Sequence, residues 1–124
     1  METALIETFP NPHPHRDYVI EHVVEEFTSL CPKTGHPDFG RITIRYIARD
    51  ACIELKSLKL YLHQYRTQGI FYEDVTNQLL THFIKACDPR WMLVQTRWTG
   101  RGGIRSTITA QHGNADEIDL AATD

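Results

Sequence analysis

The sequence predicts an α+β domain in which a four-stranded antiparallel sheet carries two helices on one face. Apolar and polar residues alternate over residues 41–49, which is typical of a half-buried strand. Over residues 54–66 and 75–87 the apolar residues instead recur three or four positions apart, as on one face of a helix. With one strand before these elements and two after them, the order is β-β-α-α-β-β, and 124 residues leave room for one domain.

The first predicted strand covers residues 17–27, where β-branched residues are frequent, although Glu25 and Glu26 interrupt the alternation. Residues 31–40 follow with two prolines and two glycines, a composition that predicts a loop. The alternation is regular in residues 41–49, which form the clearest strand. Its residues on one side are Ile42, Ile44 and Tyr46.

Two helices occupy the middle of the chain. The first is predicted over residues 54–66, with Gly69 placed where a helix ends. Its apolar face consists of Leu55, Leu58, Leu62 and Tyr65. The second begins after the acidic pair Glu73-Asp74, whose charge suits the positive end of the helix dipole, and it ends at Asp88-Pro89.

Residues 91–98 and 104–110 are the last two predicted strands, and the turn-rich segment 99–103 predicts a hairpin between them. Because the helices cover one face only, the other face is expected to keep apolar side chains such as Ile47 and Trp98. Association of subunits would cover them.

Both ends of the chain are expected to lie outside the domain, which we place at residues 15–111. Residues 1–14 carry three prolines at alternate positions and should form an extended arm that adds nothing to the core. Residues 112–124 are acidic and poor in apolar residues, so we expect a flexible tail.

Charge and composition argue against several classes of protein. The net charge of −3 and the pI near 6.1 disfavour direct binding of nucleic acid, which usually needs a strong basic excess. Residues 1–14 lack the apolar run of a secretory signal, and no stretch approaches the roughly 20 apolar residues that span a bilayer. We therefore expect a cytoplasmic protein without membrane contact, whose three cysteines remain thiols.

Cys31 is the first candidate for chemistry. It heads the Pro- and Gly-rich loop and is followed by Lys33, whose ammonium would favour the nucleophilic thiolate. The alternative is a small buried side chain without chemistry, the usual state of a free cysteine. Cys52, at an element boundary, and Cys87, on the apolar face of the second helix, fit that alternative better.

Asp38 follows Cys31 in the same loop. A simple role as a turn residue is open to it. In a partly apolar loop, however, desolvation would raise its pKa enough for proton donation near neutral pH. A cysteine and a carboxyl in one short loop are more informative together than either is alone.

The first helix also carries a basic stripe, consisting of Lys56, Lys59, His63 and Arg66. Such a stripe is most often a solvated face. Lys56, however, falls in the first turn, where the dipole disfavours a cation unless an anion is bound, and a dinucleotide phosphate would supply one. No Rossmann or P-loop motif is present, and the glycines around Arg101 are weak evidence for phosphate binding.

Glu73 has two interpretations as well. It supplies negative charge at the start of the second helix, or its carboxylate accepts paired hydrogen bonds from the ring N–H and amino group of a guanine-like base. The seven histidines form no HExxH pattern and join no cysteines at zinc spacing, so no metal site is expected.

Several spaced motifs together resemble the short 7-cyano-7-deazaguanine reductases of queuosine biosynthesis, the QueF type. The motifs are FTSLCPKTGHPDF at 27–39, ELKSLKLY at 54–61, YR at 65–66, FYED at 71–74, DPR at 88–90 and RGGI at 101–104. The resemblance covers roughly residues 20–108. One such motif could match by chance, but not all of them in the same order.

The resemblance implies the tunnelling fold (T-fold), whose β-β-α-α-β-β subunits assemble into a homo-oligomeric ring with active sites between subunits. The element order predicted above agrees with it. The expected assembly is a decamer of two stacked rings of five.

The activity that the resemblance implies is the NADPH-dependent reduction of the nitrile of 7-cyano-7-deazaguanine to an aminomethyl group through a covalent thioimide. Cys31 matches the cysteine that adds to the nitrile carbon, and Asp38 matches the proton donor. The expected substrate contacts are Ile53, Glu54, Leu55, Tyr72 and Glu73. The expected NADPH contacts, which overlap the basic stripe, are Lys56, Ser57, Lys59, Arg66 and Arg101.

The chain departs from the family pattern at Tyr72, where many members have histidine. A phenol donates a hydrogen bond but is a poor base near neutral pH, so we expect activity with altered proton handling. Two other functions stay open. One is the amidinotransferase branch, which attacks the same nitrile and is expected to lack the NADPH motif. The other is a non-catalytic T-fold protein that binds purine- or pterin-like ligands.

Overall fold

Nine elements follow one another along residues 5–114, the part of the chain that the computed structural model describes. They are β1 (Thr8–Pro10), β2 (Ile20–Leu30), β3 (Pro37–Ile47), β4 (Ala51–Ile53), α1 (Leu55–His63), the 3₁₀ helix η2 (Gln64–Thr67), α2 (Tyr72–Cys87), β5 (Trp91–Arg101) and β6 (Ile104–Gly113). The predicted order of strands and helices is therefore correct, with β1 and β4 added.

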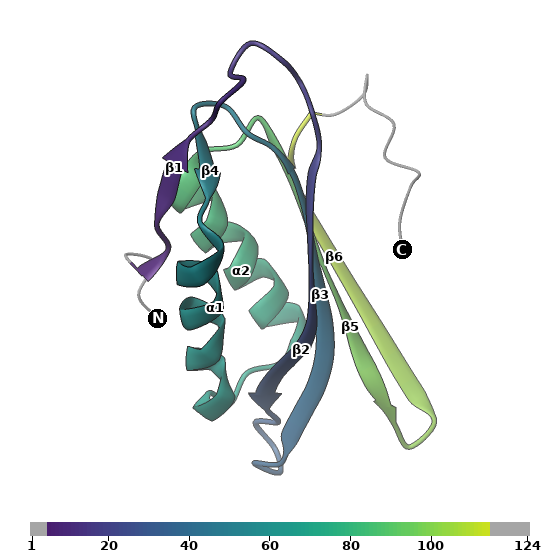
Figure 1. Cartoon of the computed structure of the whole chain (residues 1–124). Helices are drawn as coiled ribbons and strands as arrows, with labels where there is room; N and C mark the ends of the chain where they lie inside the picture. The colour runs from purple at the N-terminus through teal and green to yellow at the C-terminus, as the bar shows by residue number, and fades with distance from the viewer. Residues whose placement is uncertain (1–4, 115–124) are drawn as a thin grey trace.

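The four long strands form one antiparallel sheet in the order β2-β3-β5-β6. Helices α1 and α2 lie side by side across one face of this sheet, and β1 pairs with β4 in a small second sheet beside the start of α1 (Figure 1). This is the α+β arrangement that the alternating and helical patterns predict.

The central strand β3 explains why the sheet buries one face under the helices. Side chains alternate across a strand, so Ile42, Ile44 and Tyr46 point to the same side, and all three are 0% exposed in the core beneath α1 and α2. Ile47 points the other way and is buried beside its cross-strand partner Trp91.

A β-bulge accounts for the irregular pattern in β2. The register with β3 shifts between Val24 and Phe27, which pair with Ile42 and Gly40. The extra residue, contributed by the Glu25-Glu26 pair, lets both Val24 and Phe27 face the helices. The two glutamates that interrupt the alternation therefore mark a bulge within the strand.

Helix α1 begins at a cap supplied by a carboxylate. Glu54 has extended backbone angles, and its side chain accepts hydrogen bonds from the N–H groups of Lys56 and Ser57, at 2.8 Å each. The regular helix ends at His63, and η2 continues it to Thr67 in tighter 3₁₀ geometry. Together they cover the single helix predicted over residues 54–66.

Helix α2 begins earlier than its pattern indicated, so that the acidic pair lies inside the first turn. It ends at Cys87, and its C-cap Asp88 is the only non-glycine residue with a positive φ (46°) in the described range. Hydroxyl groups link the two helices in the core, since Tyr61 Oη contacts both Tyr65 Oη and His82 Nδ1.

The N-terminal segment takes part in the fold, which corrects the prediction of an arm without a core contribution. Ile6 is 7% exposed and belongs to the core cluster, and Thr8–Pro10 pairs with Ala51–Ile53. At the other end, the predicted tail begins inside β6, which extends to Gly113. Residues 115–124 lie outside the described residues.

Two further expectations were wrong. The loop predicted over residues 31–40 is shorter, because β3 already begins at Pro37. Trp98 does not lie on the open face of the sheet, since it pairs with Gly40, which shares its face with Ile42, and it is buried in the helix-side core at 3% exposure. The face that Trp98 occupies follows from this register, which the alternation within one strand does not give.

No helix within residues 5–114 has the length and apolar content needed to cross a membrane.

Candidate active site

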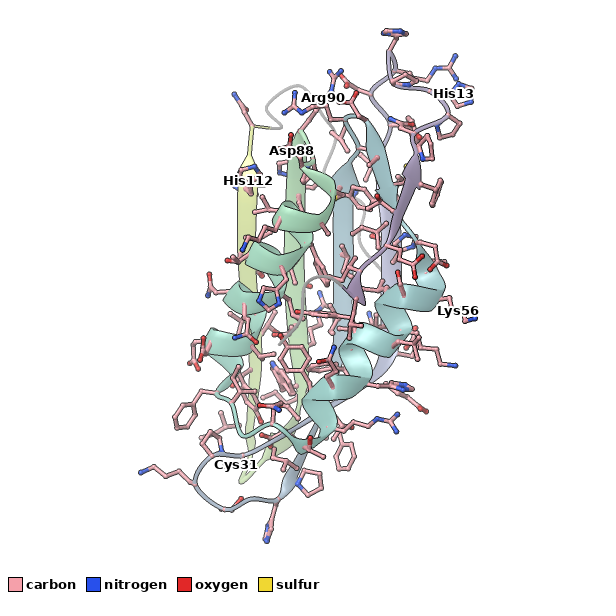
Figure 2. The ribbon with its side chains drawn as sticks, turned by 90° about the vertical axis from the view of Figure 1, so that its left-hand side faces the viewer. His13, Cys31, Lys56, Asp88, Arg90 and His112 are labelled. Atoms are coloured by element: carbon pink, nitrogen blue, oxygen red, sulfur yellow. The ribbon has the colours of Figure 1, made fainter. Side chains whose placement is uncertain are left out.

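Cys31 lies immediately after β2, at the end of the molecule opposite Asp88 and His112 (Figure 2). A tight turn holds it: its N–H donates to the carbonyl of His36 at 2.9 Å, and its own carbonyl accepts from the N–H of Gly35 at 2.8 Å. Gly35 has a φ of 74°, a conformation that favours glycine.

The turn also activates the sulfur. The Thr34 hydroxyl and the backbone N–H groups of Thr34 and Lys33 bond to the Cys31 sulfur and lower the pKa of the thiol below its ordinary value. The sequence had pointed to the ammonium of Lys33, whereas its backbone amide makes the contact. Since Cys31 is partly exposed, the sulfur is accessible to a reagent.

Asp38 lies in the second position of β3 and is 5% exposed, so it is a buried strand residue and not a turn residue. It pairs with Ser29 of β2 in the antiparallel register. The hydroxyl of Tyr72 donates to its Oδ1 at 3.2 Å. Its charge raises the pKa of the Cys31 thiol, against the larger lowering by the turn hydrogen bonds, so the two side chains lie within electrostatic reach.

A bridge between distant segments brings α2 to this place. The N–H of Leu30 donates to the carbonyl of Gln68 at 2.9 Å, and the N–H of Ile70 donates to the carbonyl of Leu30 at 3.0 Å. Leu30 and Gly69 thus form an isolated parallel β-bridge. The residue before Cys31 is therefore fastened to the segment that precedes α2.

One cavity of about 200 Å³ results from these contacts. It is lined by Cys31, Pro32, Asp38, Ile70, Phe71, Tyr72 and Glu73. Four residues predicted for catalysis or substrate binding therefore meet there, from three separate segments of the chain. No polar pattern in the sequence marks Ile70 as part of the site, although Phe71 belongs to the FYED motif.

The position of Glu73 is compatible with both of its interpretations. It lies in the first turn of α2, where its charge complements the helix dipole, and it also lines the cavity. Its side chain is exposed, so the carboxylate is accessible to a ligand.

The other predicted substrate contacts are not part of this cavity. Ile53 is 1% exposed in the core, and its N–H donates to Tyr46 Oη at 2.9 Å. Glu54 caps α1, and Leu55 is 54% exposed at the other end of that helix from η2. Within one chain these three residues lie apart from Cys31.

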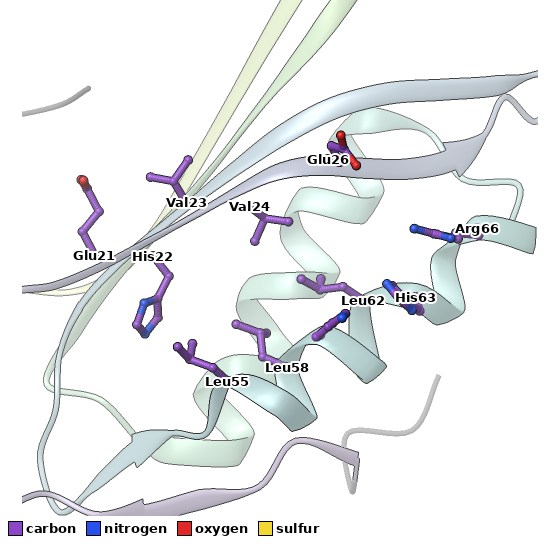
Figure 3. A pocket seen from close by; sticks show the side chains of 11 residues that line it. Glu21, His22, Val23, Val24, Glu26, Leu55, Leu58, Leu62, His63 and Arg66 are labelled. Carbon is purple, nitrogen blue, oxygen red and sulfur yellow. The ribbon is translucent and has the colours of Figure 1, made fainter.

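A second hollow, of about 660 Å³, separates β2 from α1. Its apolar wall includes Val24, Leu55, Leu58 and Leu62, and its polar side chains are Glu21, His22, Glu26, Lys59, His63 and Arg66. In Figure 3, His22 and Val24 of β2 point toward α1 across this groove. The groove thus contains three of the four residues of the predicted basic stripe.

The remaining predicted NADPH contacts have other positions. Ser57 is 3% exposed, and its hydroxyl accepts from the N–H of Glu7 and donates to the carbonyl of Glu54, at 2.8 Å each. Lys56 is exposed in the first turn of α1. The anion inferred to accompany it is present in the chain itself, because the Glu54 carboxylate caps that turn and its pKa is lowered by the capping amides.

Arg101 ends β5 and pairs through its backbone with Ile104 across the hairpin. Its side chain lies outside the described part of the structure. Cys52 and Cys87 are buried, as expected, and burial raises the pKa of the Cys87 thiol to about 12. Among residues 5–114, no three His, Cys, Asp or Glu side chains cluster as metal ligands would.

Comparison with known proteins places this geometry in a family. The model of a family described as QueF-like protein matches residues 37–117. An NADPH-dependent 7-cyano-7-deazaguanine reductase from Prosthecochloris aestuarii is 55% identical over 117 residues, covering 94% of this chain and 99% of that protein. The chain belongs to the QueF-like family.

Other QueF-like relatives agree. A reductase of the same name from Chlorobaculum tepidum is 51% identical over 117 residues, covering 94% of this chain and all of that protein. One from Magnetococcus marinus is 52% identical over 111 residues, covering 90% of this chain and 87% of that protein. The resemblance seen in the motifs is thereby confirmed.

The fold is confirmed by a solved structure. The crystal structure of the archaeosine synthase QueF-Like in the apo form superposes with a TM-score of 0.73 and covers 78% of this chain and 95% of that one. At 22% identity this likeness concerns the fold alone, and it establishes the T-fold that the resemblance implied.

Proposed function

We propose that the chain is an NADPH-dependent 7-cyano-7-deazaguanine reductase, which converts the nitrile of its substrate into an aminomethyl group. Membership of the QueF-like family and relatives of that name at 55% identity support this function. The observation that carries it is the single cavity shared by Cys31, Asp38, Tyr72 and Glu73. A nucleophile, a buried carboxyl and a carboxylate able to hold a guanine-like base are the groups that covalent addition to this nitrile requires.

The first step is addition of Cys31 to the nitrile. The thiol proton passes to Asp38, the sulfur bonds to the nitrile carbon, one π bond of the C≡N group breaks, and the nitrogen takes the proton from Asp38. The product is a thioimide. The turn amides and the Thr34 hydroxyl favour this step because they stabilise the thiolate.

Reduction then releases the enzyme. NADPH supplies a hydride in each of two steps. After the first, the C–S bond breaks, Cys31 leaves as the thiolate, and an imine remains on the substrate. The second hydride, with a proton, gives the amine. Two NADPH are oxidised for each nitrile, and Asp38 is the buried acid in the cavity that delivers protons.

The groove between β2 and α1 fits the co-substrate. Its apolar wall suits a base or nicotinamide ring, and Lys59, His63 and Arg66 supply positive charge for phosphates. Lys56, on the same helix, and Arg101, at the hairpin end, are assigned to the phosphates from the family resemblance, and not from the helix turn that Glu54 caps. Ser57 supports the groove by tying Glu7, the residue before β1, to the start of α1.

The complete site requires more than one subunit. The 200 Å³ cavity is smaller than the ~300–1,000 Å³ typical of sites for small ligands. Strands β2 and β6 are the two edges of the sheet and can pair with strands of neighbouring copies. We therefore assign the chain to a homo-oligomeric ring, two stacked rings of five, in which Ile53, Glu54 and Leu55 reach the substrate from a neighbour. Its compartment is the cytoplasm, where its three thiols stay reduced.

The function is tested by incubating the protein with 7-cyano-7-deazaguanine and NADPH. Oxidation of two NADPH per nitrile, with a mass adduct on Cys31 in their absence, is the expected result. Cys31→Ala should abolish both, whereas Cys87→Ala, far from the cavity, should retain both. Turnover by Cys31→Ala would refute the mechanism. An adduct without NADPH oxidation would indicate the amidinotransferase branch, and binding without an adduct would indicate a non-catalytic protein.

The shared site has its own test. Cys31→Ala and a Lys59→Ala/Arg66→Ala variant should each be inactive, and subunits mixed after dissociation should regain activity. If the cavity and the groove of one site come from different chains, random mixing restores both partners in about one site in four. The molar mass of the assembly, from light scattering, gives the subunit number. A monomeric enzyme with full activity would refute the ring.

A further inference from the structure

Tyr72 is held in place by an aromatic stack at the wall of the cavity. Its ring lies on the indole of Trp98, with 4.1 Å between ring centroids and 11° between planes. Trp98 is 3% exposed and also meets Phe27 edge to face, so the indole is fixed from two sides. The Tyr72 hydroxyl then reaches Oδ1 of Asp38 at 3.2 Å.

A buried chain of hydrogen bonds also joins Trp98 to Tyr72. Trp98 Nε1 donates to Thr96 Oγ1 at 2.8 Å, Thr96 and Thr76 share a hydroxyl contact of 2.6 Å, and Thr76 Oγ1 donates to the carbonyl of Tyr72 at 2.8 Å. Both threonines are 0% exposed.

The direction of this chain follows from what each group can do. An indole N–H only donates, and a carbonyl only accepts. Since Thr76 gives its one proton to the Tyr72 carbonyl, Thr96 must be the donor in the contact between the two hydroxyls. Each hydroxyl therefore donates once and accepts once, and the loop from Trp98 through Thr96 and Thr76 to Tyr72 is fully satisfied.

Gly40 provides the room for this loop. It pairs with Trp98 across β3 and β5, and a Cβ there would lie 2.8 Å from Cε3 of the indole. A side chain at this position would therefore displace Trp98. The same strand carries Asp38 two residues earlier, so the acid and the space for the indole are set by one short segment.

We propose that Thr76, Thr96 and Trp98 are positioning residues that fix Tyr72 and, through it, the carboxyl of Asp38 relative to Cys31. The inference rests on the proposed function, because it takes Asp38 as the proton donor. A donor must stand within hydrogen-bond reach of the nitrile nitrogen, and a shift of ~1 Å can slow a reaction by up to about 100-fold. Substrate binding through Glu73 does not depend on the loop.

The decisive variant is Thr96→Val, which keeps the shape of the side chain and removes the hydroxyl. In the full-length assembly, the rate constant for adduct formation at saturating 7-cyano-7-deazaguanine should fall about tenfold or more, with the dissociation constant changed less than about twofold. Thr96→Ser, which keeps the hydroxyl, should restore the wild-type rate. Thr109→Val, in an exposed pair with Gln95, is the matched control and should leave the rate unchanged.

A double-mutant cycle shows whether Thr96 acts through Tyr72. Tyr72→Phe removes the hydroxyl that contacts Asp38, and it should lower the same rate constant. Tyr72→Phe/Thr96→Val should then be no slower than the slower single variant, since both changes break one line of contacts. Losses that multiply, or equal losses in Thr96→Val and Thr96→Ser, would overturn the inference.

Trp98→Phe keeps an aromatic ring and removes the N–H, so it replaces Thr96→Val if that protein does not fold. A normal adduct rate in every variant would refute the positioning role and leave the proposed function intact. Absence of any adduct on Cys31 in the wild-type protein would refute the proposed function, and the positioning role with it.

Discussion

Gly40→Ala tests how tightly the indole of Trp98 is held. The new Cβ would lie 2.8 Å from Cε3 of Trp98 and 3.0 Å from the carbonyl oxygen of Arg97. Carbon atoms in contact normally stand ~3.5–4.0 Å apart, so the indole would have to move by about 0.7–1.2 Å. Its stack on Tyr72 and its hydrogen bond to Thr96 oppose that movement.

The expected cost follows from these contacts. Overpacking a buried site costs ~1–3 kcal/mol, and the stiffer unfolded chain of an alanine variant returns ~0.4–1 kcal/mol. At the midpoints of these ranges, the free energy of unfolding should fall by about 1.3 kcal/mol. Urea unfolding at one fixed protein concentration measures it, because the stability of an assembly depends on concentration. The displaced stack should also slow adduct formation on Cys31.

Gly69→Ala is the control for this experiment. A Cβ on Gly69 would meet nothing closer than Pro32 Cα at 3.7 Å, an ordinary contact. Its stability should equal or slightly exceed that of the wild-type protein. If Gly40→Ala were as stable as Gly69→Ala and formed the adduct at the wild-type rate, the indole would be free to move, and the packing argument would be wrong.

Three further results are expected. Thr34→Val removes a hydroxyl that lowers the pKa of Cys31, so alkylation of Cys31, followed by peptide mass spectrometry, should need a higher pH. An unchanged pH profile would show that this hydroxyl does not stabilise the thiolate. The amides that Glu54 caps lower its pKa, so its carboxylate stabilises the fold at pH values above the unfolded pKa of about 4.3 and loses that effect as the pH falls. Glu54→Gln should therefore flatten the loss of stability between about pH 5 and pH 3, measured by urea unfolding across that range. Phe83→Ala empties a fully buried site and should cost about 3–5 kcal/mol in urea unfolding, whereas a loss below about 1 kcal/mol would place Phe83 outside the core.

The elements that could be predicted are those whose residues carry a period of their own. Ile42, Ile44 and Tyr46 alternate over a strand that is buried on one face, and Leu58 and Leu62 recur on one helix face. Both patterns depend on local geometry alone, so one sequence suffices to detect them.

The features that were missed depend on contacts between distant segments. β1 has only three residues, the last of which is Pro10, so it carries no strand pattern of its own. It exists because Ala51–Ile53 pairs with it. The bulge at Glu25-Glu26 is visible only once β3 sets the register. Trp98 was placed on the wrong face for the same reason.

The residues of the candidate site also differ in whether they are close in sequence or are brought together by contacts between distant segments. Cys31 and Asp38 are close in sequence, so their common cavity could be expected from one loop. Tyr72 and Glu73 could be added only through the family resemblance, because the bridge between Leu30 and Gly69 that brings them there has no sequence signature. Helical spacing groups the groove residues of α1, but it does not predict how far they lie from Cys31.

Two features of the sequence, the tyrosine of the FYED motif and a tryptophan assigned to the wrong face, belong to one arrangement. Tyr72 can serve at the cavity because Trp98 supports its ring and because Thr76 and Thr96 close the loop behind it. Each of these residues is unremarkable within its own element, since threonine and tryptophan are common in strands and Thr76 lies on the buried face of α2. A substitution at position 72 in this chain therefore has to be judged together with residues 76, 96 and 98, which hold its side chain against Asp38.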